Sequence, residues 1–287
     1  MRFIVTGSNG QLGTELVSRL EPSHHEVLGI DLDTCDITDR DAVLAAVTTY
    51  RPDAIIHGAA FTAVDLCETR PETAYAVNSL ATRFIADAAR RVGAHLVYVS
   101  TDYVFDGTKP TPYVEWDRPN PQSVYGRSKL GGELELDPAS TIARTSWVCS
   151  AHGNNMVKTV LKLAAERDSL TFVSDQVGNP TFAGDLAAKL IELAVSRVPG
   201  VHHVTNSGSV SWYEFVREIL IAGGHSPDKV TPQTTAEFAA GRPADAPPMA
   251  PRPANSVLDN FALRASGLGE LRDFRDALAE VVGQLQG

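Results

Sequence analysis

The chain has 287 residues, a formal net charge of −10 and a pI near 5.2. This acidic balance argues against binding to nucleic acid or to an anionic membrane, because both partners attract a basic surface. The sequence has no run of 18 apolar residues, and its N-terminal apolar stretch is too short for a signal peptide, so we expect a cytoplasmic protein. Three widely spaced cysteines without a C-x-x-C pair predict neither a disulfide framework nor a metal site.

Short apolar runs alternate with stretches of helical periodicity through the first half of the chain. The runs that we expect to form strands are 3–7, 26–31, 54–60, 95–100 and 141–148. Apolar residues recur at helical spacing in 41–50 and 72–92. Continuous apolar strands that are each followed by a helix predict a parallel sheet with both faces covered, which is a doubly wound α/β fold.

The alternation continues less regularly after residue 150. An irregular loop is predicted at 239–256, over a binding cleft, because five prolines lie between Pro243 and Pro253. The other predicted elements are helices near 154–166, 183–197, 211–222 and 274–286 and strands at 171–175 and 201–206.

A G-x-x-G-x-x-G loop, formed by Gly7, Gly10 and Gly13, follows the first predicted strand and opens a helix. Glycines there permit a tight turn and a close approach of the backbone to a pyrophosphate, whose charge the helix N-terminus favours. An ordinary glycine-rich turn is the alternative, but the preceding strand and following helix favour dinucleotide binding. We therefore predict that 1–148 form a dinucleotide-binding domain for NADPH or NADH. Residues 149–287 would form a smaller α/β substrate-binding region, part of which returns to the first domain.

Asp31 ends the second predicted strand, 18 residues after Gly13. A carboxylate there would accept a hydrogen bond from the adenosine ribose and repel a 2′-phosphate, which favours NADH without excluding NADPH. A plain turn residue is the alternative. Asp36 and Ile37 begin the next predicted helix and would flank the adenine, although Asp36 fits a helix cap equally well.

Thr101 and Asp102 follow the fourth predicted strand, at the edge where parallel sheets bind ligands. Tyr125 begins a helix, and Lys129 lies one turn later on the same face, which alone is weak evidence because any such pair can meet. Together these groups suit hydride transfer to a carbonyl, whose oxygen then needs a proton. A phenol with a usual pKa near 10 is a poor acid or base unless a cation such as Lys129 favours its phenolate. Lys129 would also hold the nicotinamide ribose, and Thr101 the reacting oxygen.

Six motifs follow one another along the chain: the glycine loop, STDYVFDG (100–107), VYGRSK (124–129), RTSWV (144–148), DQVGNPT (175–181) and RPANS (252–256). They occur in the order found in the extended short-chain dehydrogenase/reductases, and among these the chain most closely resembles the dTDP-4-dehydrorhamnose reductases. The resemblance runs from residue 1 to about residue 260. It implies a Rossmann-type fold and reduction of the C4 ketone of dTDP-4-dehydro-6-deoxy-L-mannose, with NADPH or NADH, to dTDP-L-rhamnose.

The resemblance also implies roles for individual residues. Tyr125 would be the proton donor, Lys129 its electrostatic partner and Thr101 the residue that tunes its pKa. The residues that would contact the cofactor are Gly10, Gln11 and Leu12 at the pyrophosphate, Asp31 at the ribose, and Ala60, Phe61 and Thr62 after the third strand.

The substrate would meet Thr101, Asp102 and Tyr125 at the cleft. Trp147 would contact the sugar or the nucleotide, although a buried aromatic at a strand end is nearly as good an interpretation. Arg252 and Asn255 are weaker candidates for the substrate phosphates.

Some members of the resembled family dimerise through a magnesium ion held by acidic residues. Glu15 is present in the first predicted helix, but Asp185 is the only acid in the second stretch, 180–189. We therefore predict no metal ion and leave a homodimer open.

Two kinds of alternative function share much of this motif set. A sugar-nucleotide 4,6-dehydratase would have Glu where this chain has Tyr103, and an epimerase would lack the Asp-Tyr-Val-Phe-Asp-Gly continuation. The second kind is a non-catalytic module resembling the regulatory subunit of methionine adenosyltransferase, which has Ser-Ser-Asp where this chain has Ser100-Thr101-Asp102. The threonine favours a reductase.

Overall fold

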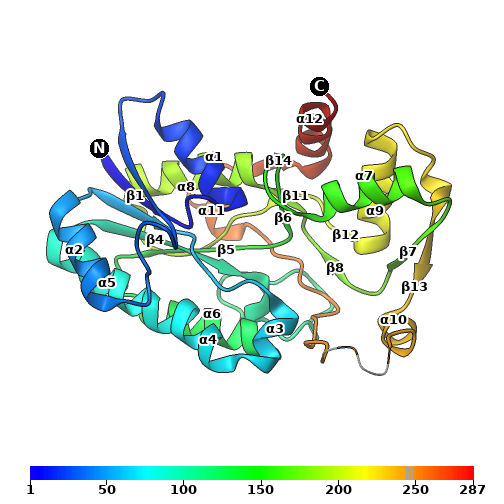
Figure 1. The fold of residues 1–287 in the computed structure, drawn as a ribbon, viewed down its shortest axis with the longest axis horizontal. Helices are drawn as coiled ribbons and strands as arrows, with labels where there is room; N and C mark the ends of the chain where they lie inside the picture. The colour runs from blue at the N-terminus through cyan, green and yellow to red at the C-terminus, as the bar shows by residue number, and fades with distance from the viewer. Residues whose placement is uncertain (244–245, 247) are drawn as a thin grey trace.

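Six parallel strands form the central sheet of the computed structural model, which describes residues 1–243, 246 and 248–287 (Figure 1). Their order across the sheet is β10-β5-β4-β3-β1-β2, and every neighbouring pair is parallel. The strands are β1 (Arg2–Thr6), β2 (Glu26–Ile30), β3 (Ala54–His57), β4 (His95–Thr101), β5 (Thr141–Thr145) and β10 (Gly200–His203). The chain runs outward from β1 to β2 and then returns to the other side of β1 as β3. Such a reversal is where open parallel sheets bind ligands.

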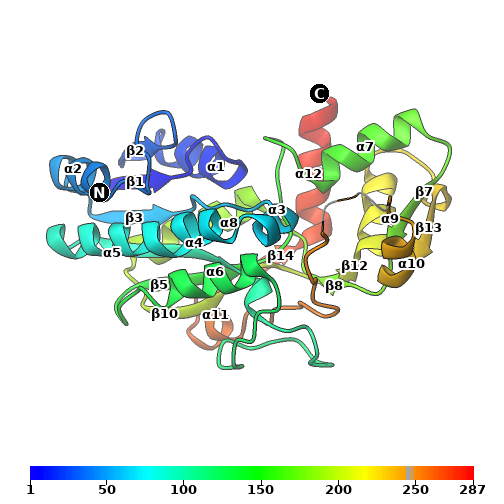
Figure 2. The same ribbon diagram turned by 60° about the horizontal axis from the view of Figure 1, so that its bottom comes forward.

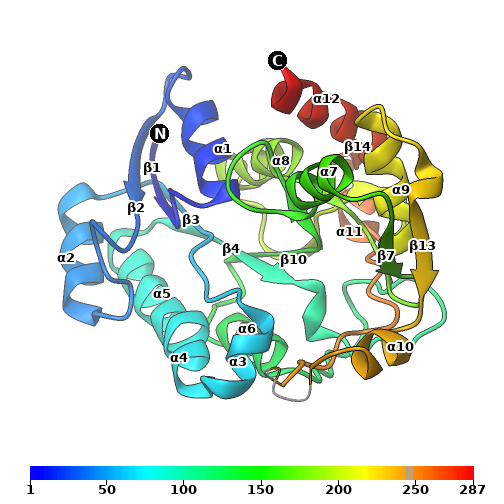
Figure 3. The same cartoon turned by 45° about the vertical axis from the view of Figure 1, so that its right-hand side comes forward.

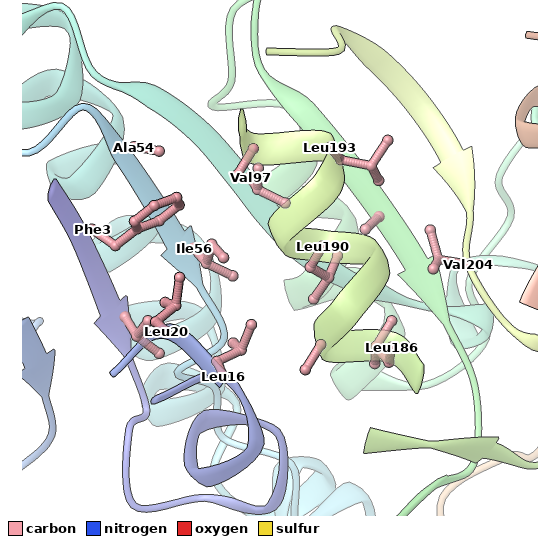
Figure 4. Close-up of a cluster of buried hydrophobic side chains, with 14 of the residues drawn as sticks. Phe3, Leu16, Leu20, Ala54, Ile56, Val97, Leu186, Leu190, Leu193 and Val204 are labelled. Atoms are coloured by element: carbon pink, nitrogen blue, oxygen red, sulfur yellow. The ribbon is translucent and has the colours of Figure 1, made fainter. Parts of the chain in front are cut away.

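Helices cover both faces of the sheet, which confirms the predicted doubly wound α/β fold. On one face α1 (Gln11–Leu20) packs against α8 (Ala183–Val195), and on the other α2 (Arg40–Tyr50) packs against α5 (Ala81–Val92) (Figure 2). Figure 4 shows the first core, in which leucines of α1 and α8 meet Phe3 and Ile56 of the sheet. Each large apolar side chain buried in this way stabilises the fold by about 1.5–3 kcal/mol relative to exposure.

The segment between β3 and β4 is helical but changes its winding. The predicted helix at 72–92 forms as α4 (Pro71–Tyr75), the π-helical turn η1 (Ala76–Leu80) and α5. A short helix that was not predicted, α3 (Val64–Thr69), precedes it. Asn78 lies within η1 and is buried. A π-helical turn of this kind shifts the register of a helix and often marks a functional site.

A second core lies beside the sheet and has its own helices (Figure 3). Here α7 (Met156–Glu166), α9 (Trp212–Ala222) and α12 (Phe274–Gln286) pack together, and a parallel pair of strands, β7 (Leu170–Val173) and β13 (Val230–Gln233), packs on α9. The short strands around this core are β6 (Val148–Cys149), β8 (Val177–Gly178), β9 (Thr181–Phe182), β11 (Asn206–Ser207), β12 (Val210–Ser211) and β14 (Leu271–Asp273). The remaining elements are α6 (Val124–Glu133), α10 (Thr235–Ala240), α11 (Phe261–Ala265) and the 3-10 turns η2 (Asp102–Val104) and η3 (Pro227–Lys229).

The predicted domain boundary at residue 148 remains a proposal. Two elements beyond it belong to the sheet layer, because β10 pairs with β5 and α8 packs on α1. The predicted loop at 239–256 includes 244–245 and 247, which lie outside the described residues, and its first two residues end α10. Among the helices described, none is both long and apolar enough to cross a bilayer.

Two local predictions were wrong. The second helix does not begin at Asp36, because α2 begins at Arg40, where Asp39 caps it by accepting hydrogen bonds from two backbone N–H groups. The strand predicted at 141–148 is interrupted after β5, because Trp147 has a φ of 46°. That left-handed backbone is uncommon for a residue with a Cβ and cannot continue a strand.

Candidate active site

Three neighbouring strands bring the predicted site residues together at the carboxyl edge of the sheet. β1 leads into the glycine loop, β3 leads into 58–62, and β4 ends at Thr101. Helix α6 packs against β4 and η1, which places Tyr125 and Lys129 at the same edge. Segments far apart in the sequence therefore meet beside the reversal in strand order.

The three glycines of the loop lack a side chain for different structural reasons. Gly7 has a φ of 72°, and a Cβ there would lie 2.9 Å from the backbone nitrogen of Ala59. A Cβ on Gly13 would lie 2.6 Å from the Cα of Ser8 and would also overlap the carbonyl oxygen of Gly7. Gly10 has an ordinary φ of −76°, and a Cβ there would lie 3.2 Å from that oxygen. The conformation of the loop itself thus requires glycine at positions 7 and 13. At Gly10 the missing side chain mainly leaves space beside the loop.

The start of α1 fits the pyrophosphate of a dinucleotide. Within the described residues 1–243, this helix start has neither a side-chain cap nor an acidic residue in its first turn. Its first N–H groups therefore suit an anion. Gln11 is held in place from the second region, since its Oε1 accepts a 2.9 Å hydrogen bond from Nδ2 of Asn155. The sequence analysis missed Asn155, whose pattern indicates only a helix cap for α7.

Asp31 contacts the glycine loop directly. Its Oδ2 accepts a 2.9 Å hydrogen bond from the N–H of Asn9, and its Oδ1 accepts one of the same length from Leu32. A carboxylate keeps lone pairs beyond these two bonds, so a ribose hydroxyl can still donate to it. Asp36 instead closes a turn with Thr38, and Ile37 packs in the core beneath α2. Ile37 thus has a packing role in this structure, and its contact with adenine stays a prediction.

The loop after β3 is joined to α6 through Asn78. The N–H of Phe61 donates to Oδ1 of Asn78 at 2.8 Å, and Nδ2 of Asn78 donates back to the Phe61 carbonyl at 3.2 Å. The same Nδ2 donates to the hydroxyl of Ser128 at 2.9 Å. Asn78 therefore fixes the 60–62 segment, including Ala60 and Thr62, against the helix that carries Tyr125. A polar residue on the apolar face of a predicted helix was the only sequence signal for it.

Tyr125 and Lys129 lie on the buried face of α6, with 9% and 2% of their surfaces exposed. Two acceptors fix the start of the helix, since Ser123 accepts from the N–H of Gly126 at 3.0 Å and Glu68 accepts from Val124 at 2.8 Å. One turn of helix separates the phenol from the ammonium, as the spacing predicted.

The ammonium of Lys129 is held on the side of β4. Its Nζ donates a 2.7 Å hydrogen bond to the carbonyl of Val99 and lies 4.0 Å from the ring centroid of Tyr98. Burial lowers the pKa of Lys129 to about 7, against the attraction of Glu133.

Burial raises the pKa of the Tyr125 phenol well above its usual range, and a hydrogen bond with Thr101 opposes the rise. Burial is the largest cause of this raised pKa, and the effect of Lys129 on the phenolate stays a prediction. A raised pKa keeps the phenol protonated, which is the form that a proton donor needs.

Thr101 and Asp102 adjoin the phenol and are both buried. The hydroxyl of Thr101 donates to Oδ1 of Asp102 at 3.0 Å and accepts from the N–H of Tyr103 at 3.2 Å. The other carboxylate oxygen of Asp102 is buried and makes no hydrogen bond of ordinary length to a described residue. Burial raises the pKa of Asp102 to about 6, and the nearby hydroxyls of Ser256 and Thr101 oppose the rise. The ring of Tyr103 meets that of Tyr125 edge-on, with centroids 5.6 Å apart.

The three remaining substrate candidates differ in their surroundings. Trp147 is partly buried, and its ring stacks on Trp212 with centroids 3.5 Å apart and planes 6° from parallel. Arg252 pairs with Asp65, and Nη2 lies 3.0 Å from Oδ1. The amide of Asn255 donates to the carbonyls of Lys109 and Thr111, at 2.7 and 3.3 Å. The structure thus gives Asn255 a role in joining two loops, and its contact with a phosphate stays a prediction.

The two acids considered for a metal ion have other partners. Glu15 lies 3.7 Å from Nε2 of His152 and 3.9 Å from Nε of Arg19. Asp185 accepts from Arg272 at 2.9 Å and from Asn206 at 2.7 Å. Across the ranges that the structure describes, no three His, Cys, Asp or Glu side chains are grouped to hold a metal.

Comparisons with known proteins match this site over almost the whole chain. The family model described as RmlD substrate binding domain matches residues 1–286. The dTDP-4-dehydrorhamnose reductase of Aggregatibacter actinomycetemcomitans is 42% identical over 98% of this chain and 98% of its own. A Streptomyces antibioticus protein, named a probable dTDP-4,6-dihydroxy-2-methyloxan-3-one 4-ketoreductase, is also 42% identical, over 98% of this chain and 94% of its own.

A solved structure agrees with these sequence matches. The dTDP-4-dehydrorhamnose reductase of Bacillus anthracis, in complex with NADP, superposes with a TM-score of 0.92 and 38% identity over 99% of each chain. The family predicted from the motifs is confirmed. The chain belongs to the RmlD substrate binding domain family, the family of the dTDP-4-dehydrorhamnose reductases.

Proposed function

We propose that the protein reduces the C4 ketone of dTDP-4-dehydro-6-deoxy-L-mannose, with NADPH or NADH, to dTDP-L-rhamnose. The observation that carries this proposal is the position of the buried phenol of Tyr125. It lies beside Thr101, at the edge of the sheet where the glycine loop and the 58–62 loop meet. The full-length match to reductases of this substrate supports it.

The reduced nicotinamide, when bound, supplies the hydride. The chain supplies the proton and holds the ketone. In this proposal Tyr125 donates its phenolic proton to the C4 oxygen, and Thr101 hydrogen-bonds the same oxygen. Lys129 lies one helical turn from the phenol, and its positive charge stabilises the phenolate that remains.

The names of the relatives differ in the sugar that is reduced. The Streptomyces antibioticus relative is as similar as the Aggregatibacter reductase, and its name gives a different dTDP-linked ketosugar. Both names describe reduction at C4 of a dTDP sugar. Reduction of a C4 ketone on a dTDP sugar is therefore the common chemistry, and the rhamnose precursor is the substrate to test first.

The direct test is turnover of freshly prepared dTDP-4-dehydro-6-deoxy-L-mannose by the purified protein. We expect oxidation of NADPH or NADH and one equivalent of dTDP-L-rhamnose, identified by mass and by sugar analysis. Tyr125→Phe should lower kcat by about 10²- to 10⁴-fold, the usual effect of a positioned general acid, with little change in KM. Tyr75→Phe, on the half-exposed face of α4, is the matched control and should keep wild-type kcat.

Two results would overturn the proposal. Cofactor binding without turnover of the sugar would favour the non-catalytic regulatory module. Near-normal turnover by Tyr125→Phe at saturating substrate would remove the tyrosine from the chemistry. We further propose that the enzyme works in the cytoplasm. A homodimer is left open, and sedimentation of the purified protein would determine the oligomeric state.

A further inference from the structure

Helix α3 carries two acids that each hold a different segment of the chain. Asp65 and Glu68 are three residues apart and so lie on neighbouring positions of one helical face. Glu68 accepts from the N–H of Val124, the first residue of α6. Asp65 accepts a 2.9 Å hydrogen bond from the N–H of Ala250, 185 residues later. The helix that follows the 60–62 segment is thus tied both to the Tyr125 helix and to residues 250–252.

Asp65 also pairs with Arg252, and this ion pair fixes the orientation of the guanidinium. Nη2 of the guanidinium lies 3.0 Å from Oδ1 and 3.1 Å from Oδ2 of Asp65, while Nη1 donates to the carbonyl of Ala250 at 3.0 Å. Burial would raise the pKa of Asp65, but the hydrogen bonds from Arg252 and Ala250 outweigh it and lower the pKa. The carboxylate therefore stays charged near neutral pH.

Residues 250–255 are held from the opposite side by the loop after β4. A Cβ on Gly107, whose φ is 78°, would lie 2.5 Å from the Cα of Pro253, so the two backbones are in close contact. The N–H of Asn255 donates to the carbonyl of Gly107 at 3.2 Å. Arg252 thus lies in a segment fixed between α3 and the loop that follows Thr101.

The Asp65–Arg252 pair borders the reaction site through Tyr103. The phenol of Tyr103 is within electrostatic range of Asp65, Arg252 and Asp102, and its ring meets that of Tyr125. A guanidinium has five N–H donors, and the contacts above use one on each terminal nitrogen. Among the described residues, the Nε–H of Arg252 and the second hydrogen on each terminal nitrogen remain available.

We propose that Asp65 is a positioning residue for the nucleotide sugar, which it serves by orienting Arg252 so that the remaining donors meet the diphosphate. This inference rests on the proposed function for the identity of the ligand. Arginine recognises phosphate by paired hydrogen bonds, so the direction of its planar head matters as much as its charge. In a chain with a net charge of −10, one fixed guanidinium is a suitable local attraction for a dianionic ligand.

The alternative is that the charge of Asp65 simply repels an anionic ligand. This alternative predicts the opposite change in ligand affinity, so an experiment can distinguish the two. If Asp65 only repels an anionic ligand, Asp65→Ala should bind it more tightly. If Asp65 positions Arg252, Asp65→Ala should bind it more weakly. Asp65→Asn keeps an oxygen acceptor for Ala250 while losing the charge, so it should fall between wild type and Asp65→Ala.

The experiment is calorimetric titration of the full chain with dTDP, which requires no turnover. We expect Asp65→Ala to weaken dTDP binding by about tenfold, the size of one charge-assisted hydrogen bond. Glu72→Ala removes an exposed acid from the neighbouring helix α4 and should leave dTDP affinity unchanged. Affinity for NADPH should also be unchanged in Asp65→Ala, and kcat at saturating sugar should stay near wild type while KM rises.

A double-mutant cycle tests whether Asp65 acts through Arg252. Asp65→Ala should have little further effect on dTDP affinity once Arg252→Ala is present, because the positioned group is gone. Unchanged or tighter dTDP binding by Asp65→Ala, or full additivity in the cycle, would overturn the inference. Both side chains are partly exposed, so the variants should fold, and thermal unfolding would verify this. If the wild-type protein turns over the sugar but Asp65→Ala binds dTDP with unchanged affinity, only the role of Asp65 is refuted. If Asp65→Ala binds dTDP more weakly but the wild-type protein has no turnover, only the proposed function is refuted.

Discussion

Glu133 and Arg144 form a buried two-point ion pair one helical turn beyond Lys129, because Glu133 lies on the same face of α6 as Tyr125 and Lys129. Nε and Nη2 of Arg144 donate to the two carboxylate oxygens of Glu133 at 2.9 and 2.7 Å, and each side chain is 4% exposed. The hydroxyl of Ser100 donates to the same carboxylate at 2.6 Å. Because Ser100 immediately precedes Thr101, the pair joins the end of β4 and strand β5 to α6. It therefore fixes the distance between the threonine and the phenol.

Glu133→Gln should destabilise the protein by about 3–5 kcal/mol, because it leaves the buried charge of Arg144 uncompensated. Chemical denaturation of the purified variant measures this loss. The double variant Glu133→Met/Arg144→Met is the control, since it removes both charges and should recover most of the stability. A loss below about 1 kcal/mol in the single variant would show that the pair is not needed for the fold.

Gly13→Ala should disrupt the glycine loop, whereas Gly10→Ala should be tolerated by the fold. An added Cβ at Gly13 would overlap backbone atoms of Gly7 and Ser8, while at Gly10 it meets one atom at 3.2 Å and φ is ordinary. We expect Gly13→Ala to lower both the melting temperature and NADPH affinity. Gly10→Ala should keep its melting temperature without cofactor and lose affinity alone, as a side chain facing the pyrophosphate would require. Equal melting temperatures for the two variants would contradict this assignment.

Asp31→Ala should shift the cofactor preference toward NADPH by about 1–2 kcal/mol, because it removes a charge that repels the extra phosphate. The structure adds a second effect. The carboxylate also accepts from the N–H groups of Asn9 and Leu32, so its loss loosens the loop and should weaken both cofactors. The ratio of kcat/KM for NADPH to that for NADH measures the preference independently of this common loss. An unchanged ratio would leave Asp31 as a turn residue.

The sequence predicted the parts of the molecule that depend on local patterns. The first five strands of the sheet were recognisable as continuous apolar runs, and the Tyr125–Lys129 spacing holds because one helix carries both residues. The glycine loop was equally clear, because its three glycines lie within seven residues of sequence.

The parts that could not be predicted depend on contacts between distant segments. The bond from Ala250 to Asp65 joins residues 185 apart, and no local pattern indicates it. Helix α3 is six residues long, too short for apolar periodicity to show. The raised pKa of Tyr125 and the lowered pKa of Lys129 follow from burial by several elements at once, whereas the sequence analysis considered only their mutual attraction.

The burial of Lys129 predicts that the stability of the protein depends on pH. Its pKa falls from 10.5 in the unfolded chain to about 7 in the folded protein. Between these values the unfolded chain binds a proton that the folded protein lacks, so the free energy of unfolding rises with pH across that window. The cost of burying the charge is fully present below pH 7. The groups that face the ammonium are Tyr98, Val99, His57 and Glu133, and the pKa of His57 is lowered to about 3, outside the window.

Lys129→Met should therefore be more stable than wild type near pH 7, by about 2–4 kcal/mol, and the difference should shrink as pH rises toward 10. The same variant should lose most of its turnover, because the phenolate of Tyr125 would no longer have a cation nearby. Denaturant unfolding of both proteins at several values between pH 6 and 10 measures the difference, in which titrations common to the two proteins cancel. Lys129→Arg is the matched control and should keep the burial cost at every pH, since its guanidinium does not titrate in this range. A stability difference between wild type and Lys129→Met that stays constant across the window would show that Lys129 is not buried as a titrating charge.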